Sequence, residues 1–252
     1  MPPPGARPAT RLAESTWPEA ADAARLGRWL VVPLGSTEQH GPHLPLSTDS
    51  DIAVAIAEGA AARNGRLMVA PPVAYGASGE HQAFPGTLSI GQDATELLLV
   101  ELGRSAVIGF DRVVVVSAHG GNAAPVARAT HRLAEEGHAV SAWSPSWSGD
   151  LHAGRSETSL MLAIRPEWVH LERAERGDPR PLDDLLPRLR SGGVRSVSDN
   201  GVLGDPAGAT AEEGRRLLDQ AVHRLLSVLE DLAVAAYSSP GSTVLIVPEG
   251  RR

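Results

Sequence analysis

The stretch that decides the fold is residues 112–122, RVVVVSAHGGN, in which four consecutive valines run directly into a polar, glycine-rich turn. β-Branched residues favour strands, and a strand that is apolar at every position is typical of a parallel sheet covered on both faces. Residues 29–34, WLVVPL, have the same character and also end at a polar loop. We therefore expect two central strands of a parallel sheet, each followed by a loop that carries chemistry.

The remainder of the chain alternates strands with helices around this centre. Short apolar runs predict two further strands, at 67–70 and 139–143. Longer patterns with capping and terminating residues predict five helices, at 51–62, 93–108, 122–136, 158–164 and 211–236. In the second of these helices we expect Leu97, Leu98 and Val100 to face inward. The alternation predicts an α/β fold of three layers, α/β/α, with a mostly parallel central sheet.

The domain organisation expected from the sequence is simple. A chain of 252 residues is long enough for one α/β domain, which we place at 17–237. Residues 1–16 are rich in proline and are expected to be disordered, and 238–252 are expected to be a flexible tail in which 244–247 could add an edge strand. Residues 175–208 are rich in proline, glycine and arginine, which predicts excursion loops over the functional site or at an oligomer contact.

The composition excludes several classes of function. The chain has no cysteine, which rules out disulfides, thiolate nucleophiles and zinc–thiolate sites, and it has no lysine for Schiff-base chemistry. A net charge of −7 without a basic stripe argues against a nucleic-acid partner. No run approaches the ~20 apolar residues that cross a membrane, and no signal-peptide core precedes the domain. We expect a cytoplasmic protein with no membrane partner.

The loop after the first strand carries three potential metal ligands, Glu38, His40 and Asp49. Carboxylate and imidazole groups form an N/O ligand set that suits zinc, manganese or iron. Glycine and proline residues in the loop favour one fixed shape. The alternative is a solvated surface turn in which Asp49 serves only as a helix N-cap.

Further candidates follow the other strands. His119 comes directly after the valine strand, and His152 and Glu157 follow the strand at 139–143. The ligand crevice of an open parallel sheet lies outside the carboxyl ends of its strands, so three segments deliver these side chains to one place. Each residue also has an ordinary explanation: a turn for His119, a solvated loop for His152, and for Glu157 a helix start, where the dipole favours an acid.

Residues near this crevice could contact a substrate. His43 and His81 are expected to support the ligands or to touch the substrate. The backbone N–H groups of Gly120 and Gly121 could hold an anion or an oxyanion, although a tight turn explains the two glycines equally well. Trp143 could stack on an aromatic substrate, with packing in the core or at an oligomer contact as the alternative.

Four separated motifs together resemble the creatininase family of metal-dependent amidohydrolases. They are GSTEQHGPHLP at 35–45 with Asp49, FPGTLS at 84–89, HGGN at 119–122, and HAG with ETS at 152–159. The resemblance runs from about residue 30 to 166. It implies a layered α/β fold, two divalent metal ions per subunit (Zn²⁺, Fe²⁺ or Mn²⁺) and a cyclic or dihedral homo-oligomer.

The resemblance also implies roles for single residues. Glu38, His40, Asp49 and His119 match the metal ligands, with Asp49 bridging both ions, and His152 matches the acid/base histidine. The chain departs from creatininases at Gly121, where they carry a metal-binding glutamate. Glu157 is the only evident replacement in the sequence, so we count it both as a metal ligand and as a catalytic candidate.

The missing glutamate argues against creatinine as the substrate. Family branches with the HGGN motif include a deformylase and a peptidase, and the lysine-free composition favours the peptidase branch. We expect hydrolysis of an amide bond in a short modified peptide, with release of a Val-Tyr-derived dipeptide. The alternatives are an amidohydrolase or deformylase acting on a small cyclic amide or formamide, and a non-catalytic module whose glycine-rich turn holds an anion.

Overall fold

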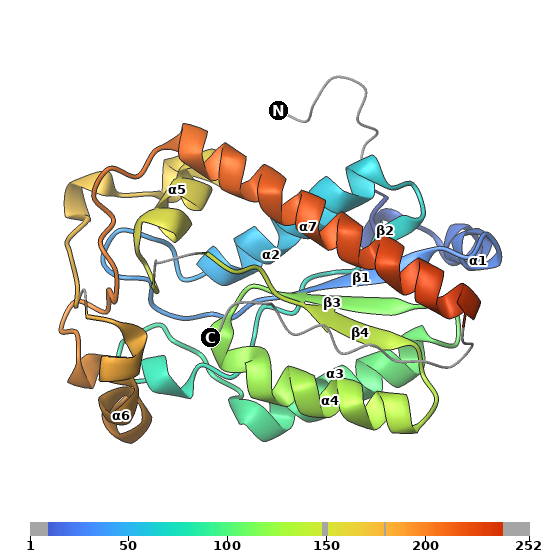
Figure 1. Ribbon diagram of the computed structural model, residues 1–252, viewed down its shortest axis with the longest axis horizontal. Helices are drawn as coiled ribbons and strands as arrows, with labels where there is room; N and C mark the ends of the chain where they lie inside the picture. Colours follow the sequence, from blue (N-terminus) through green and yellow to red (C-terminus); the bar gives the residue numbers. More distant parts are fainter. Residues whose placement is uncertain (1–9, 148–150, 179, 239–252) are drawn as a thin grey trace.

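A computed structural model describes residues 10–147, 151–178 and 180–238. Its centre is a four-stranded parallel sheet in the order β2-β1-β3-β4 (Figure 1). The strands are β1 (Trp29–Leu34), β2 (Leu67–Val69), β3 (Val113–Ser117) and β4 (Val140–Trp143). The sequence therefore predicted all four strands to within a residue or two, and the parallel sheet is confirmed.

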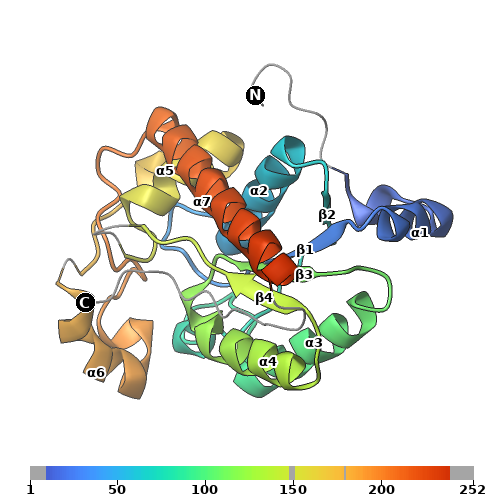
Figure 2. The same ribbon diagram turned by 45° about the vertical axis from the view of Figure 1, so that its right-hand side comes forward.

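Helices cover both faces of this sheet, which confirms the three layers. One face is covered by α2 (Thr48–Arg63), α5 (Arg155–Ile164) and α7 (Ala211–Ser238), and the other by α3 (Gly91–Ala106) and α4 (Ala123–Glu135) (Figures 1 and 2). The valines of β3 alternate between the two cores, because successive side chains of a strand point to opposite faces. Val114 and Val116 pack on the α2 and α7 side, and Val113 and Val115 on the α3 and α4 side.

Pro33 lies inside a central strand, where a proline is normally excluded because it has no N–H to donate. The register explains why it is tolerated. The N–H of Trp29 points toward β2 and donates to Arg66 O. Pro33 lies an even number of residues further along the strand, so its nitrogen points toward the same side. Strand β2 ends at Val69, which pairs with Val31, so the nitrogen of Pro33 lies beyond the end of β2. Pairing on this side continues there only through the isolated bridge between Leu34 and Val73, in which Pro33 takes part by accepting a hydrogen bond from Val73 N.

The region 175–208 is not made of loops alone, which corrects the sequence-based expectation. It contains α6 (Leu182–Gly192) and the short 3-10 helix η6 (Val194–Ser196). Pro187 lies inside α6 and hid the helix from the sequence pattern. Leu185, Val194 and Leu203 form a small core of their own, separate from the two sheet cores.

The chain before residue 17 is also more ordered than expected. Residues 10–16 include the 3-10 helix η1 (Leu12–Glu14), and Thr10 O accepts a hydrogen bond from Val69 N at the sheet edge. The helix α1 (Trp17–Arg25) follows, begun by a capping box between Thr16 and Glu19. The expectations for 1–9 and for the tail beyond 238 lie outside the described residues.

Three helix details differ from the sequence-based predictions. Helix α2 begins at Thr48 after Ser47, so Asp49 belongs to its first turn and is not its cap. Helix α5 begins at Arg155, which places Glu157 in its first turn. Leu97 is 55% exposed, which contradicts its predicted inward position; Leu99 and Val100 are the buried pair.

Four further 3-10 helices complete the described elements: η2 (Gly79–His81), η3 (Gly120–Asn122), η4 (Pro166–Trp168) and η5 (Leu171–Arg173). Among the described helices, none has the length and apolar character needed to cross a membrane.

Candidate metal centre

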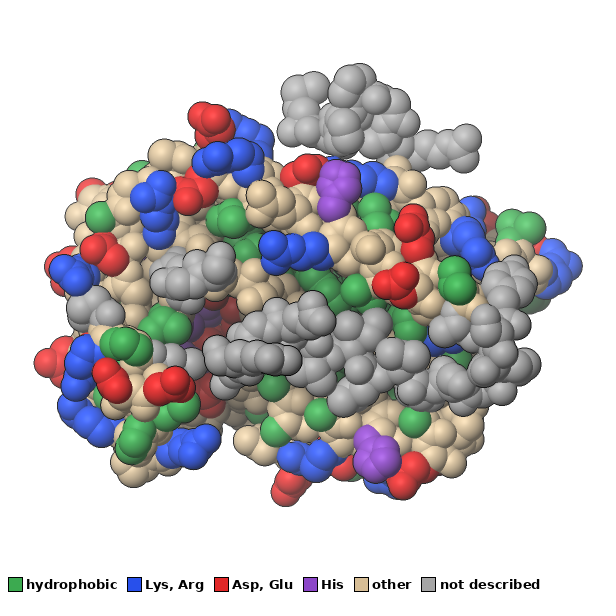
Figure 3. Space-filling view, in the orientation of Figure 1, with side chains coloured by type: hydrophobic (Ala, Val, Ile, Leu, Met, Phe, Trp, Pro, Cys, Tyr) green, Lys and Arg blue, Asp and Glu red, His purple; other side chains and the backbone are tan. Residues whose placement is uncertain are grey.

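The strand register brings the predicted ligand loops to one edge of the sheet. Leu34 at the end of β1 pairs with Ser117 at the end of β3, and Val116 pairs with Trp143 at the end of β4. The loops that follow these strands therefore start side by side. In the space-filling view, acidic and histidine side chains lie in a recess on the left, near α5 and α6 (Figure 3).

The first turn of α2 is held against the loop after β1. A Cβ on Gly35 would lie 2.4 Å from Ser50 N, so only glycine permits this close approach. The hydroxyl of Ser36 donates to Asp49 Oδ2 over 2.5 Å. Asp49 is thereby fixed at the carboxyl edge of the sheet, at the N-terminal end of a helix that favours negative charge.

Four of the predicted ligands meet in this buried space. His40 Nε2 lies 3.2 Å from Asp49 Oδ1, and His119 Nδ1 lies 3.4 Å from Asp49 Oδ2. His119 Nε2 lies 3.2 Å from Glu38 Oε2. All four residues are at most 7% exposed. Glu157, the fifth predicted ligand, joins them from α5, with its Oε2 3.8 Å from His40 Nε2.

Backbone carbonyl groups orient two of the imidazoles. His40 Nδ1 lies 3.2 Å from Glu38 O, and His152 Nε2 lies 2.8 Å from Gln39 O, so each of these nitrogens carries the proton and donates it. When the rings are neutral, as in a metal complex, the other nitrogen of each ring points its lone pair toward carboxylate oxygens. Metal-binding histidines are typically held in this way.

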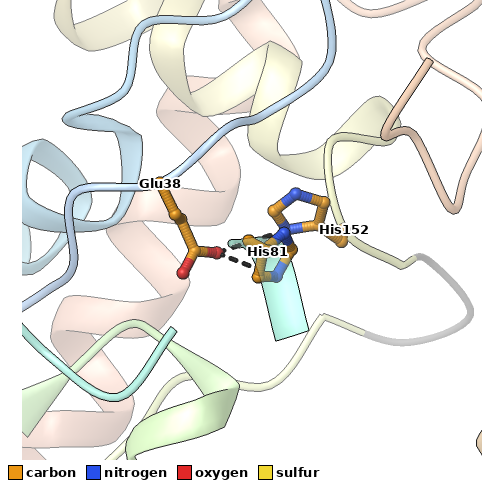
Figure 4. A group of neighbouring side chains, drawn as sticks. All are labelled: Glu38, His81 and His152. Carbon is orange, nitrogen blue, oxygen red and sulfur yellow. Dashed lines mark ion pairs between the residues drawn. The ribbon is translucent and has the colours of Figure 1, made fainter. Parts of the chain in front are cut away.

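The carboxylate of Glu38 gives the clearest indication that this site can bind a cation. Neither of its oxygens accepts a hydrogen bond within the described part of the chain, and the side chain is fully buried. Its Oε1 lies 3.2 Å from His81 Nε2 and 3.8 Å from His152 Nδ1, and all three side chains point toward one another (Figure 4). Burial raises the pKa of Glu38. A buried carboxylate without donors is costly unless a cation compensates it.

The donor set therefore fits divalent cations. Three groups of residues each place one ligand atom per residue within 4.8 Å of the others: Glu38 with His81 and His152, His40 with His152 and Glu157, and Glu38 with His40 and Asp49. His119 is not in these groups, but it contacts Glu38 and Asp49 through its two nitrogens.

Charges in the centre act strongly on its titratable groups. Burial opposes the charge on His40, but Asp49 and the neighbouring glutamates raise its pKa above the ordinary value. Burial likewise opposes ionisation of Asp49, but the positive charge on His40 lowers its pKa. Burial lowers the pKa of His152 well below its ordinary value, and the positive charge on His40 lowers it further.

Comparison with known protein families identifies the family of this chain. The sequence profile of the creatininase family, described as creatinine amidohydrolase, matches residues 13–229. The chain belongs to the creatininase family. It is 50% identical over 223 residues to the mycofactocin precursor peptide peptidase of Mycobacterium ulcerans, a match that covers 84% of this chain and 85% of the relative.

Solved structures of the creatininase family share the fold. A creatinine amidohydrolase crystal structure superposes with a TM-score of 0.77 at 26% identity, covering 92% of this chain and 98% of that chain. A manganese form of creatininase has a TM-score of 0.77 at 25% identity, covering 88% of this chain and 98% of that chain. A Zn–Zn form of a creatininase mutant has the same TM-score and identity, covering 89% and 98%.

Two predicted substrate-binding residues of this creatininase-family chain are packed in its interior. Trp143 is 6% exposed and belongs to the core beneath α2, α5 and α7, which favours the packing alternative. His43 is fully buried, and its Nε2 is 2.9 Å from Thr158 Oγ1. Neither side chain is open to a substrate in this conformation. Gly120 and Gly121 open η3 directly after His119; Gly121 lies against the His119 ring, whereas Gly120 is exposed.

Gln39 is a site residue that the sequence analysis missed. Its amide nitrogen lies 3.1 Å from Gly201 O and 2.8 Å from His81 Nδ1, and its Oε1 accepts a hydrogen bond from Gly41 N at 2.8 Å. An amide nitrogen only donates, so His81 Nδ1 is the acceptor and the proton of a neutral His81 is on Nε2. That nitrogen lies 3.2 Å from Glu38 Oε1, but the two atoms do not form a hydrogen bond. The one sequence signal for Gln39 was its position between the predicted ligands Glu38 and His40.

Proposed function

We propose that this chain is a metal-dependent peptidase that hydrolyses an amide bond near the C-terminus of the mycofactocin precursor peptide. The observation that supports metal-dependent hydrolysis is the buried Glu38 carboxylate, which accepts no hydrogen bond and faces imidazole nitrogens. The 50% identity to a mycofactocin precursor peptide peptidase over 84% of the chain supports the peptide substrate.

Five residues would hold two divalent cations in this proposal: Glu38, His40, Asp49, His119 and Glu157. Asp49 is suited to contact both ions, because one of its oxygens faces His40 and the other faces His119. The manganese and Zn–Zn forms of creatininases support ions of this class. When bound, such cations supply Lewis acidity toward a carbonyl group and lower the pKa of water.

His152 is the residue that we assign to proton transfer. Its Nε2–H is held by Gln39 O, which leaves Nδ1 unprotonated and directed toward Glu38, 3.8 Å away. Nδ1 can therefore accept a proton from the attacking water and return it to the leaving amine. An amide nitrogen leaves poorly unless it is protonated, so this transfer contributes directly to the rate.

The other functions considered receive less support. A non-catalytic anion-binding module leaves the converging carboxylates and imidazoles without a role. Deformylation of a small formamide uses the same centre, and a deformylase of Methanothermobacter thermautotrophicus is 30% identical over 84% of this chain. Cytoplasmic location and homo-oligomeric assembly remain predictions.

The test compares substrates and one matched pair of variants. Metal-loaded protein is incubated with the modified precursor peptide, with creatinine and with a formamide, and products are identified by mass spectrometry. We expect cleavage of the peptide with release of a dipeptide, and no turnover of creatinine. Turnover of creatinine or the formamide without peptide cleavage would overturn the peptidase assignment.

The variants test the role of His152. His152→Ala should retain metal and bind peptide but lose about 10²–10⁴-fold in turnover, the usual range for general acid–base catalysis. His131→Ala, on the exposed face of α4, serves as the control. The loss should be smaller for an activated anilide, whose leaving group needs less protonation. Equal losses on both substrates, or loss of metal, would assign His152 to metal binding.

A further inference from the structure

Gly121 lies at a position where the backbone is too close to its neighbours for any side chain. A Cβ placed there would lie 2.4 Å from Ala77 O, 2.4 Å from His119 Nε2 and 2.6 Å from Glu80 Oε1. The His119 nitrogen belongs to the candidate metal centre, and Glu80 Oε1 is a carboxylate oxygen. The space that a side chain at residue 121 would enter is thus already occupied by Glu80.

The Glu80 carboxylate reaches the centre from the solvent side. Its Oε1 lies 3.8 Å from His119 Nε2, which itself lies 3.2 Å from Glu38 Oε2. The side chain is 35% exposed, whereas those of Glu38 and His119 are at most 5% exposed. Within the described part of the chain, His119 is the one ion-pair partner found for Glu80. No arginine therefore competes there for its charge.

The segment 175–208, which contains α6, packs against the backbone of Glu80. Gly193, at the end of α6, has a φ of +66°, and a Cβ on it would lie 2.6 Å from Glu80 O. The backbone of Gly193 therefore packs closely against η2, which carries both Glu80 and His81. Phe84, directly after η2, packs on the small core of Leu185, Val194 and Leu203. The position of Glu80 is therefore set by the fold.

We propose that Glu80 is a further metal ligand of this centre, next to His119, and that it supplies the carboxylate that residue 121 cannot. The proposal rests on the metal centre described under the proposed function. With Glu80, four carboxylates surround the centre, namely Glu38, Asp49, Glu157 and Glu80. Their combined charge balances two divalent cations, and oxygen ligands suit manganese and iron as well as zinc.

The experiment measures metal binding directly. Wild type, Glu80→Gln and Glu80→Asp are dialysed against a competing chelator, metal content is determined by elemental analysis, and Mn²⁺ or Zn²⁺ affinity by titration calorimetry. Glu80→Gln should bind one of the two ions at least about 10–100-fold more weakly, since removal of even an outer partner of a metal ligand has this effect. Glu80→Asp, which keeps the charge, should recover part of the affinity. Glu167→Gln, an exposed glutamate of η4, is the control.

The outcomes separate this inference from the proposed function. If the wild type binds two ions and Glu80→Gln binds both with unchanged affinity, Glu80 is not a ligand and the hydrolytic centre stands without it. If the wild type binds one ion, the same affinity comparison decides the role of Glu80 for that ion. If the wild type binds no divalent cation, both the metal centre and the role of Glu80 are overturned.

Discussion

Two clusters of charged side chains in this molecule differ in whether their charges are satisfied by the protein itself. On the surface, Arg104 of α3 donates to Glu136 of the α3–α4 layer over 2.8 and 2.5 Å and to Glu101 over 2.6 Å. At the carboxyl edge of the sheet, Glu38 and Asp49 face imidazole nitrogens at 3.2–3.8 Å, and Glu38 accepts no hydrogen bond.

The difference shows how an incomplete cluster points to a ligand. The surface carboxylates accept hydrogen bonds from the guanidinium group of Arg104 and are open to solvent, so their charge needs no further cation. The buried Glu38 accepts no hydrogen bond, and His40 and His152, when neutral, direct lone pairs toward the buried carboxylates. We therefore expect a cation to compensate the buried carboxylates. Removing charges from the two clusters should therefore have very different effects.

The largest effect is expected from Asp49→Ala. Because Asp49 faces both His40 and His119, its loss should release both metal ions and reduce turnover by about 10³-fold or more, since metal catalysis supplies several kcal/mol. Elemental analysis and peptide turnover are the measurements. Wild-type metal content in this variant would mean that Asp49 only supports the start of α2.

A more selective effect is expected from Glu157→Gln. The Glu157 carboxylate lies 3.8 Å from His40 Nε2 and accepts a hydrogen bond from Ala153 N at 2.7 Å. Glutamine keeps an acceptor for Ala153 but loses the charge, so one ion should bind more weakly while the other stays bound. Metal titration of the two sites checks this. If both ions are retained at full affinity and turnover is unchanged, Glu157 holds the loop and not the metal.

The smallest effect is expected at the surface, from Glu136→Gln. Hydrogen bonds from Arg104 lower the pKa of Glu136 from 4.5 to about 2 in the folded protein. The folded-state pKa lies below the unfolded value, so this stabilisation is fully present above pH 4.5 and is lost as the pH falls toward 2. The variant should have a slightly lower unfolding midpoint at pH 7, and high salt should reduce the difference.

Unfolding midpoints measured from pH 7 to pH 3 test that statement. The gap between wild type and Glu136→Gln should narrow steadily below pH 4.5. A gap as large at pH 3 as at pH 7, or a loss of metal in this variant, would remove the distinction between the two clusters.

Much of the fold was predictable because the strands are wholly apolar. Residues 29–34 have no alternative to a buried strand, and the observed β1 has those same bounds. The orientation of α3 was less predictable: Leu97, Leu98 and Leu99 are consecutive, and successive residues of a helix point about 100° apart, so a shift of one residue changes the buried set. Helix α6 was missed because local signals, Pro187 and Gly193, argued against it.

For the site, the sequence predicted ligand types better than their surroundings. Glu38, His40 and Asp49 lie close together in the sequence, and their spacing in one loop indicated their chemistry. The roles of Gln39 and Glu80 depend on contacts with Gly201 and Gly193, more than a hundred residues further along the chain. No local pattern contains that information.

The order of the ligands along the chain has a consequence for folding. Glu38 and Asp49 precede β2, whereas His119 follows β3 and Glu157 lies on α5. The centre is therefore complete only after the last strand of the sheet has been synthesised and paired, since each ligand depends on a strand end for its place. Two large hydrophobic cores are available to assemble the sheet beforehand. We therefore expect metal loading to be a late step, with the ions entering a finished scaffold.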